Sequence, residues 1–143
     1  MHLFIDADGC PSVRSAVECA RRHGVAATLV CDTAHRFDLA GAEVVYVDRG
    51  PDSADLCLAN RLSPGDVAIT QDYGLAALCL ARGARAVHPS GMEYTSGNID
   101  SLLLARHKAR KLRNAGERLK GPSKRTREQE QALLRKLDEL LSQ

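Results

Sequence analysis

Short apolar runs that alternate with helical segments are the feature that most constrains the fold of this chain. Most of these runs are apolar at nearly every position, instead of alternating between apolar and polar residues. Strands of that kind are buried on both faces, which is typical of a parallel sheet covered by helices on both sides. The runs predict five strands, at residues 2–6, 25–31, 43–48, 66–70 and 84–88.

Segments with apolar residues at helical spacing lie between and after these runs. Pro11 opens the first helical stretch, and Gly24 is a natural stop after it. Further helices are predicted at residues 52–62, 72–82, 99–114 and 126–142. The stretch SGMEYTSGNID after Pro89 is predicted to be a loop. We therefore expect an α/β fold, a three-layer domain with a mainly parallel sheet of about five strands flanked by helices, plus a C-terminal helical tail.

The distribution of charge divides the predicted domain into two parts. A chain of 143 residues suits a single domain, 1–143, with an α/β body at 1–98 and a basic helical extension at 99–143. Residues 1–100 contain 8 arginines, no lysine and 13 acidic residues, whereas residues 101–143 contain 12 basic and 5 acidic residues. This pattern fits a protein that uses a divalent metal on a polyanion, and equally one with a solvated helical tail. The leucine stripe of the last helix closes on its own domain or on a second copy, as a homodimer.

Composition and spacing exclude several classes of protein and site. No N-terminal signal peptide is recognisable, and no run approaches the roughly 18 apolar residues of a membrane span. We therefore expect a soluble, cytoplasmic protein with no membrane partner. The histidines, His23 among them, show no metal-ligand spacing, and we interpret them as surface or core residues. The cysteines are odd in number without a CxxC pair, and those within apolar runs, such as Cys19, are interpreted as buried reduced thiols.

Aspartates gather where the predicted strands end. Asp6 and Asp8 follow the first strand, Asp52 and Asp55 lie just beyond the third, and Asp72 follows the fourth. In an open parallel sheet, functional groups meet outside the carboxyl ends of the strands. Carboxylates brought together there repel one another unless they are protonated or bridged by a cation. Since oxygen ligands suit Mg²⁺ or Mn²⁺, the sequence predicts a divalent-metal site at this edge.

Helix capping is the alternative explanation for these aspartates. Asp is a preferred N-cap, and Asp8, Asp52 and Asp72 each precede a predicted helix. Asp6 ends a strand and is not needed as a cap, and Asp55 lies inside a helix start that Asp52 already caps. Capping and metal binding both stay open for this set.

The motif FIDADG also resembles the first motif of haloacid-dehalogenase-like phosphatases, with Asp6 as the nucleophile and Asp8 as the acid/base. Such an enzyme needs a cation near the transferred phosphoryl group, usually a lysine, and no lysine precedes Lys108. Neither GxGxxG nor a Walker A motif is present, so nucleotide binding of those types has no support. A small-molecule phosphatase is kept as the second alternative.

Five segments resemble the YaiI/YqxD family of bacterial proteins: FIDADGCP, RGPDSADLCLAN, GDVAITQDYGLAA, SGMEYTSGNID and LRNAGERLKGP. The resemblance spans nearly the whole chain. That family has no established biochemical function, but its fold is grouped with PIN-like and NYN-type domains, whose better-known members are metal-dependent ribonucleases. The resemblance therefore implies a PIN-like fold and a ribonuclease-like activity that uses Mg²⁺ or Mn²⁺.

The same resemblance assigns roles to individual residues. It implies a metal-binding and catalytic role for the matching acidic positions, Asp6, Asp55 and Asp72, with Asp8 and Asp52 next in line. It also makes Asp100 an outer ligand and Thr70 a residue that orients a ligand.

The basic extension would hold RNA through its phosphates. Residues 106–127 contain ten basic residues and one acidic residue. The residues expected to bind nucleic acid are Arg106, Arg110, Arg113 and Lys120. The first hypothesis is thus a metal-dependent ribonuclease, and its main alternative is a nucleic-acid-binding or regulatory module without catalysis.

Overall fold

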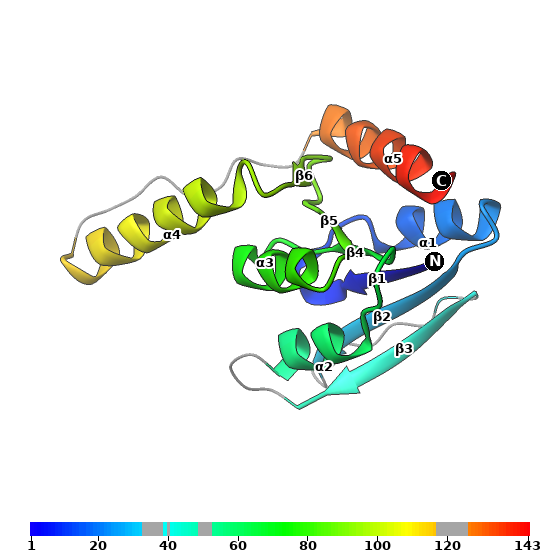
Figure 1. Ribbon diagram of the computed structural model, residues 1–143, viewed down its shortest axis with the longest axis horizontal. Helices are drawn as coiled ribbons and strands as arrows, with labels where there is room; N and C mark the ends of the chain where they lie inside the picture. The colour runs from blue at the N-terminus through cyan, green and yellow to red at the C-terminus, as the bar shows by residue number, and fades with distance from the viewer. Residues whose placement is uncertain (33–38, 40, 49–52, 117–125) are drawn as a thin grey trace.

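The computed structural model describes residues 1–32, 39, 41–48, 53–116 and 126–143. Within these residues, one sheet has the strand order β3-β2-β1-β4-β5-β6 (Figure 1). The strands are β1 (His2–Asp6), β2 (Ala26–Asp32), β3 (Ala42–Val47), β4 (Val67–Ile69), β5 (Arg85–Val87) and β6 (Glu93–Tyr94). The helices are η1 (Ala7–Gly9, a 3-10 turn), α1 (Val13–Arg22), α2 (Ser53–Arg61), α3 (Tyr73–Ala81), α4 (Ile99–Asn114) and α5 (Arg127–Leu141).

The first five strands are parallel, which confirms the predicted α/β class. The prediction of a loop at 90–100 was wrong in part, because Glu93 and Tyr94 form the antiparallel edge strand β6. The chain turns back after β5 through two hydrogen bonds, from the Gly91 amide to the His88 carbonyl at 2.9 Å and from the His88 amide to the Met92 carbonyl at 2.8 Å. A strand of two residues is too short to show a period of two in the sequence.

Helices cover both faces of the sheet, which explains the uniformly apolar strands. Along β1, Leu3 and Ile5 contact the core beneath α1 and α5, whereas Phe4 contacts the core beneath α2 and α3. Successive side chains of a strand point to opposite faces, so a strand with helices on both sides needs an apolar residue at every position. The result is the expected three-layer arrangement (Figure 1).

The last helix, α5, packs against α1. Thr126 caps it in a capping box with Gln129, each side chain accepting from the backbone N–H of the other residue. Its apolar stripe is buried and belongs to the same core as α1: Leu133, Leu137, Leu140 and Leu141. Burying a leucine contributes about 1.5–3 kcal/mol, so this face stabilises the monomer considerably. The stripe is occupied within its own chain, and the structure lends no support to a homodimer through it.

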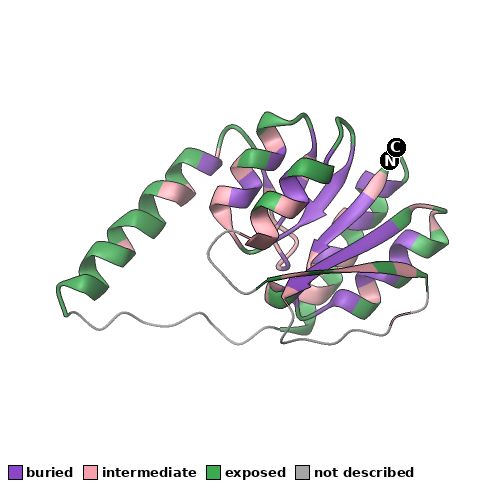
Figure 2. Cartoon of the chain, turned by 90° about the horizontal axis from the view of Figure 1, so that it is seen from below, coloured by how far each residue is buried: buried purple, intermediate pink, exposed green. Residues whose placement is uncertain are grey.

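The basic helix α4 extends away from the body of the molecule (Figures 1 and 2). Only its first residue, Ile99, is buried, and Leu102 and Leu103 are half-buried where α4 meets α3. The remainder of α4 is exposed for most of its length and carries the predicted basic side chains. In the part of the chain that the structure describes, no helix combines the length and apolar character needed to cross a membrane.

Candidate functional site

Asp6 and Thr70 lie side by side where the strand order reverses. β1 has β2 on one side and β4 on the other, and Ile5 pairs with Ile69 in the last register position of β1 and β4. Asp6 is therefore the last residue of β1, and Thr70 directly follows β4. The Thr70 hydroxyl donates to Asp6 Oδ2 at 2.9 Å. The crevice outside the carboxyl ends at such a reversal is the usual binding position in open α/β sheets.

Thr70 is held from several sides and positions two aspartates. Its hydroxyl also accepts from the Asp72 backbone N–H at 2.9 Å, and its carbonyl accepts from the buried Tyr94 hydroxyl at 3.0 Å. Thr70 itself is fully buried. Thr70 was predicted to orient a ligand, but the contact of Tyr94 with it was not predicted, because that contact depends on the edge strand β6.

Asp72 does cap a helix, as the alternative explanation expected. Its Oδ1 accepts from the Leu75 backbone N–H at 3.1 Å at the start of α3. The same oxygen pairs with Arg106 Nη1 of α4 at 3.2 Å. Capping does not bury the group, since about 30% of the Asp72 side chain stays exposed. Asp72 thus joins α3 to the basic helix and still faces solvent.

The surroundings of Asp6 perturb its acid chemistry. Burial raises the pKa of Asp6 above its ordinary value of 3.8, and the negative charges of Asp8 and Asp72 raise it further. The hydrogen bond from Thr70 opposes this by stabilising the charged carboxylate. A bound cation would offset both the burial and the repulsion, so the surroundings of Asp6 fit a metal ligand.

A cavity of about 360 Å³ is lined by Asp72, but not by Asp6 or Thr70. It is lined by residues of three helices, α2, α3 and α4: Asp55, Leu56, Asp72, Gly74, Leu78 and Arg106. Asp55 comes from the first turn of α2, and Leu56 and Leu78 are 59% and 44% exposed. The cavity is therefore lined by two carboxylates, one guanidinium and two leucine side chains. The leucines were not singled out from the sequence, because isolated apolar residues on helices give no functional signal.

The other predicted residues lie around this centre or outside the described chain. Asp8 lies in η1, and its Oδ2 accepts from the backbone N–H of Asp32 at the end of β2 at 2.9 Å. The capping alternative does not hold for Asp8, because Ser12 occupies the N-cap position of α1. The chain needs a 3-10 turn before α1, which displaces Asp8 from the helix start. Asp100 is exposed in the first turn of α4 and does not line the cavity.

Two predicted residues, Asp52 and Lys120, lie outside the described residues. Arg110 and Arg113 are exposed on α4. Arg110 lines a smaller hollow of about 240 Å³ together with Leu103, Arg106 and His107. Arg106 therefore borders both hollows and connects the acidic edge to the basic helix.

The donor set suits a hydrated cation. Among the described residues, the aspartates do not form a compact group of three ligand atoms of the kind that encloses an ion. Mg²⁺ keeps several waters and takes one or two protein carboxylates, so a closed cage is not required. Asp6 and Asp72 at adjacent strand ends fit that mode of binding.

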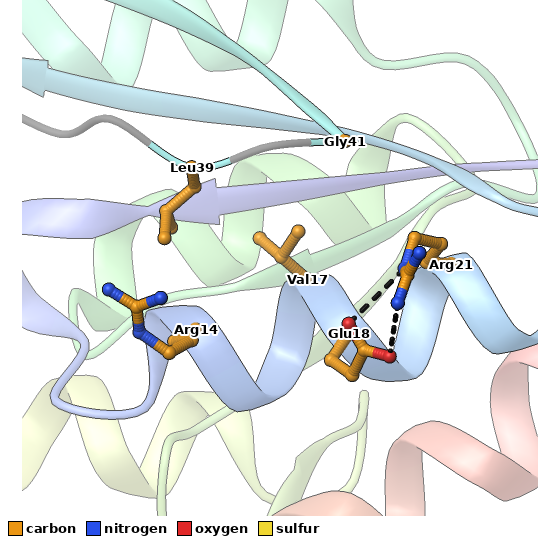
Figure 3. A pocket seen from close by; sticks show the side chains of 6 residues that line it. All are labelled: Arg14, Val17, Glu18, Arg21, Leu39 and Gly41. Atoms are coloured by element: carbon orange, nitrogen blue, oxygen red, sulfur yellow. Dashed lines mark hydrogen bonds and ion pairs between the residues drawn. The ribbon is translucent and has the colours of Figure 1, made fainter.

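A second cavity, of about 390 Å³, lies between α1 and the segment before β3 (Figure 3). Its lining includes Arg14 and Leu39, and the Arg21 guanidinium donates to both carboxylate oxygens of Glu18, at 2.8 and 3.2 Å. That ion pair neutralises much of the local charge, and none of the predicted ligands lines the cavity. We therefore assign this second cavity no role in the acidic site.

Replacing Thr70 with valine is expected to destabilise the protein by about 1–3 kcal/mol at neutral pH. The change removes the hydroxyl that donates to Asp6 and accepts from the Asp72 N–H. The loss should shrink on acidification, because the Thr70 hydroxyl stabilises the charged form of Asp6 and protonation removes that charge. Urea unfolding at several pH values measures this, with Thr70→Ser as the control that keeps the hydroxyl. Equal losses for both variants would contradict the prediction.

Comparison with known proteins places the chain in a family. A model of the family described as "Uncharacterized BCR, YaiI/YqxD family" matches residues 4–143. A UPF0178 protein of Exiguobacterium sibiricum is 46% identical over 143 residues, covering 100% of this chain and 98% of the relative. UPF0178 proteins of Clostridium tetani and Clostridium acetobutylicum are 39% and 41% identical, covering 96% and 92% of this chain and 94% and 90% of the relatives. No solved structure matches the chain. This protein belongs to the YaiI/YqxD family.

Proposed function

We propose that this protein is a PIN-like ribonuclease that hydrolyses RNA phosphodiesters with Mg²⁺ or Mn²⁺. The observation that carries the proposal is the placement of Asp6, Thr70 and Asp72 at the reversal of the strand order, where Asp72 also lines a cavity together with Asp55. The resemblance of the acidic motifs to PIN-like domains supports the same activity.

Each residue of the site has a part in this proposal. Asp6 and Asp72 would hold the ion, with Asp55 lining the same cavity as Asp72 and Asp8 close enough for its charge to act on Asp6. A divalent ion in such a site supplies an activated water and stabilises the charge that develops on the phosphate. Thr70 fixes the Asp6 carboxylate and the Asp72 backbone, so the two ligands keep their relative position.

Arg106 is suited to bind the substrate phosphate beside the carboxylates. Its guanidinium lies 3.2 Å from Asp72 Oδ1 and is 41% exposed, so it can contact an anion without leaving the cavity. Arg110 and Arg113 follow at one and two helical turns on α4, which places them along the same side of the helix. An RNA backbone lying along α4 would thus lead one phosphate to the acidic edge.

A non-catalytic nucleic-acid-binding module is the second candidate. It is favoured by Asp72 Oδ1, which accepts from both the Leu75 amide and Arg106 and so has two partners within the protein. Incubation of the full chain with labelled RNA, with and without Mn²⁺ and a chelator, separates the two. We expect cleavage that needs Mn²⁺ and stops with the chelator. Binding without cleavage would favour the module, and turnover of a phosphomonoester while RNA survives would favour the phosphatase.

Arg110→Ala and Arg113→Ala are each expected to weaken RNA binding and to reduce its dependence on salt. Each arginine that contacts a phosphate releases about one counterion on binding, so the slope of log affinity against log salt should fall by about 1 per substitution. Filter binding at several salt concentrations measures the slope. Arg135→Ala, an exposed arginine on α5, is the matched control and should leave the slope unchanged. An unchanged slope in both α4 variants would argue against RNA along this helix.

A further inference from the structure

Cys19, His23 and Asp138 converge where α1 meets α5. Cys19 and His23 are one helical turn apart on α1, so both side chains face the same way. The Cys19 thiol donates to Asp138 Oδ1 at 3.3 Å, and His23 Nε2 lies 2.9 Å from the same oxygen. One ligand atom of each residue lies within 4.8 Å of the other two. Across the described segments of the chain, no other set of cysteine, histidine and acidic side chains is as compact.

We propose that Cys19, His23 and Asp138 bind a transition-metal ion of the Zn²⁺ type. Zn²⁺ takes sulfur, nitrogen and oxygen ligands at about 2.0–2.3 Å, so its tetrahedral ligands lie roughly 3.3–3.6 Å from one another. The two distances to Asp138 Oδ1, 3.3 and 2.9 Å, are close to that spacing. An ion therefore needs only small side-chain adjustments to reach all three atoms.

The charges and chemistry of the three groups select the kind of ion. A thiolate, a carboxylate and a neutral imidazole balance a divalent cation, which suits a partly buried position. Sulfur and imidazole ligands favour Zn²⁺ over the hard ions Mg²⁺ and Ca²⁺. Arg22 also acts on this cluster, and its positive charge favours the thiolate of Cys19 while opposing the cation.

The fourth ligand position faces solvent. Cys19 is fully buried, whereas 24% of the His23 side chain and 52% of the Asp138 side chain are exposed. A water completes the tetrahedron on that side. The site is thus closed by protein on the thiol side and open to ions on the carboxylate side.

A nucleophilic role for Cys19 does not fit the same geometry. Its thiol donates to the carboxylate of Asp138 and not to the imidazole of His23, so it lacks an activating base. Burial, together with Asp138, raises the pKa of Cys19 to about 11. A metal ion is the partner that converts such a thiol to a thiolate near neutral pH.

A bound ion would link the C-terminal helix α5 to α1 and so stabilise their packing. Cys19 belongs to α1, His23 is the C-cap of that helix and Asp138 belongs to α5, and these helices cover one face of the sheet. The acidic cavity is lined by α2, α3 and α4 instead. The metal cluster is therefore separate from the proposed catalytic edge, and its role is to stabilise the packing of α5.

Titration of the full chain with Co²⁺ tests the site through a signal that only a thiolate ligand produces. We expect a near-ultraviolet sulfur-to-cobalt absorption band that saturates at one ion per chain and disappears when Zn²⁺ is added. Cys19→Ser should abolish the band, and Asp138→Asn or His23→Gln should weaken binding at least about tenfold. Cys57→Ser, at a half-buried cysteine outside the cluster, and Asp72→Asn should leave the band unchanged.

Thermal unfolding is the second readout. Zn²⁺ should raise the melting temperature of the wild type and leave that of Asp138→Asn almost unchanged, because a ligand that binds only the folded state stabilises it. Asp138 is a surface residue, so this variant is expected to fold even if Cys19→Ser does not. Absence of the thiolate band in the wild type, or its persistence in folded Cys19→Ser, would overturn the proposal. The cluster would then be only a hydrogen-bonded contact between α1 and α5.

Discussion

Asp6→Asn is expected to abolish Mn²⁺-dependent RNA hydrolysis, by at least about 100-fold, while the folded state keeps or gains stability at neutral pH. Loss of an outer-shell partner of a metal already costs 10–100-fold, and Asp6 is proposed as a direct ligand. The asparagine oxygen can still accept the hydrogen bond from Thr70, so the local contact survives. The variant separates function from folding, because it removes the charge and keeps the shape.

The pH dependence of stability follows from the raised pKa of Asp6. Since the folded state holds this proton more tightly than the unfolded state, wild-type stability falls as the pH rises from 3.8 through the folded pKa. The asparagine in Asp6→Asn does not ionise, so this variant does not lose stability in that way as the pH rises. Its stability advantage over the wild type should therefore be largest at neutral pH and fade as the pH falls towards 3.8.

Asp66→Asn is the matched control for this experiment. Asp66 is a buried aspartate beside β4, whereas Asp6 is half-buried; Asp66 lies at the amino end of the strand and accepts from the backbone N–H groups of His2 and Ser63. We expect this variant to lose stability and keep its activity per folded molecule. Urea unfolding at several pH values and RNA hydrolysis measure the two effects. An active Asp6→Asn protein would refute the assignment of Asp6.

Gly91→Ala is expected to destabilise the protein by about 2–5 kcal/mol. Gly91 has φ +93°, a left-handed conformation that costs an alanine about 1–2 kcal/mol. A Cβ at this position would lie 2.6 Å from the carbonyl carbon of Ala132 and 2.8 Å from the Leu133 amide nitrogen, both in the backbone of α5. Overpacking against backbone adds about 1–3 kcal/mol. The turn between β5 and β6 therefore needs glycine so that α5 can approach it.

Gly65→Ala provides the comparison. Gly65 has a similar φ of +89°, but a Cβ there meets no atom within 4 Å. It should show only the backbone cost of about 1–2 kcal/mol. Urea unfolding of both variants measures the difference, which isolates the contact between Gly91 and α5. Equal losses in the free energy of unfolding for the two variants would mean that α5 moves away from a Cβ at position 91 with little loss of stability.

Much of the fold followed from local patterns in the chain. The apolar runs at 2–6 and 25–31 became β1 and β2 almost unchanged, because burial on both faces leaves a signal in every residue of a strand. The helix predicted at 126–142 became α5 with Thr126 as its cap. The edge strand β6 was missed because two residues carry no periodic signal.

The candidate site was predictable only in outline. Parallel topology brings strand ends to one edge, so Asp6 and Asp72 could be placed near each other from the sequence. For Asp72 the sequence left both helix capping and metal binding open, and the structure shows that Asp72 caps α3. For Asp8, capping and metal binding were both open from the sequence; the structure excludes the cap, because a 3-10 turn precedes α1, and shows that Asp8 accepts from the Asp32 amide.

Periodicity and strand direction are local properties, so the parallel sheet with helices on both faces and the aspartates at its carboxyl edge were predictable from the residues alone. Which side chains meet depends on tertiary packing. The Thr70–Asp6 contact joins residues 64 positions apart, Arg106–Asp72 joins residues 34 apart, and His23–Asp138 joins residues 115 apart. Contacts over such separations depend on how whole helices pack against the sheet, and no short stretch of sequence encodes that packing.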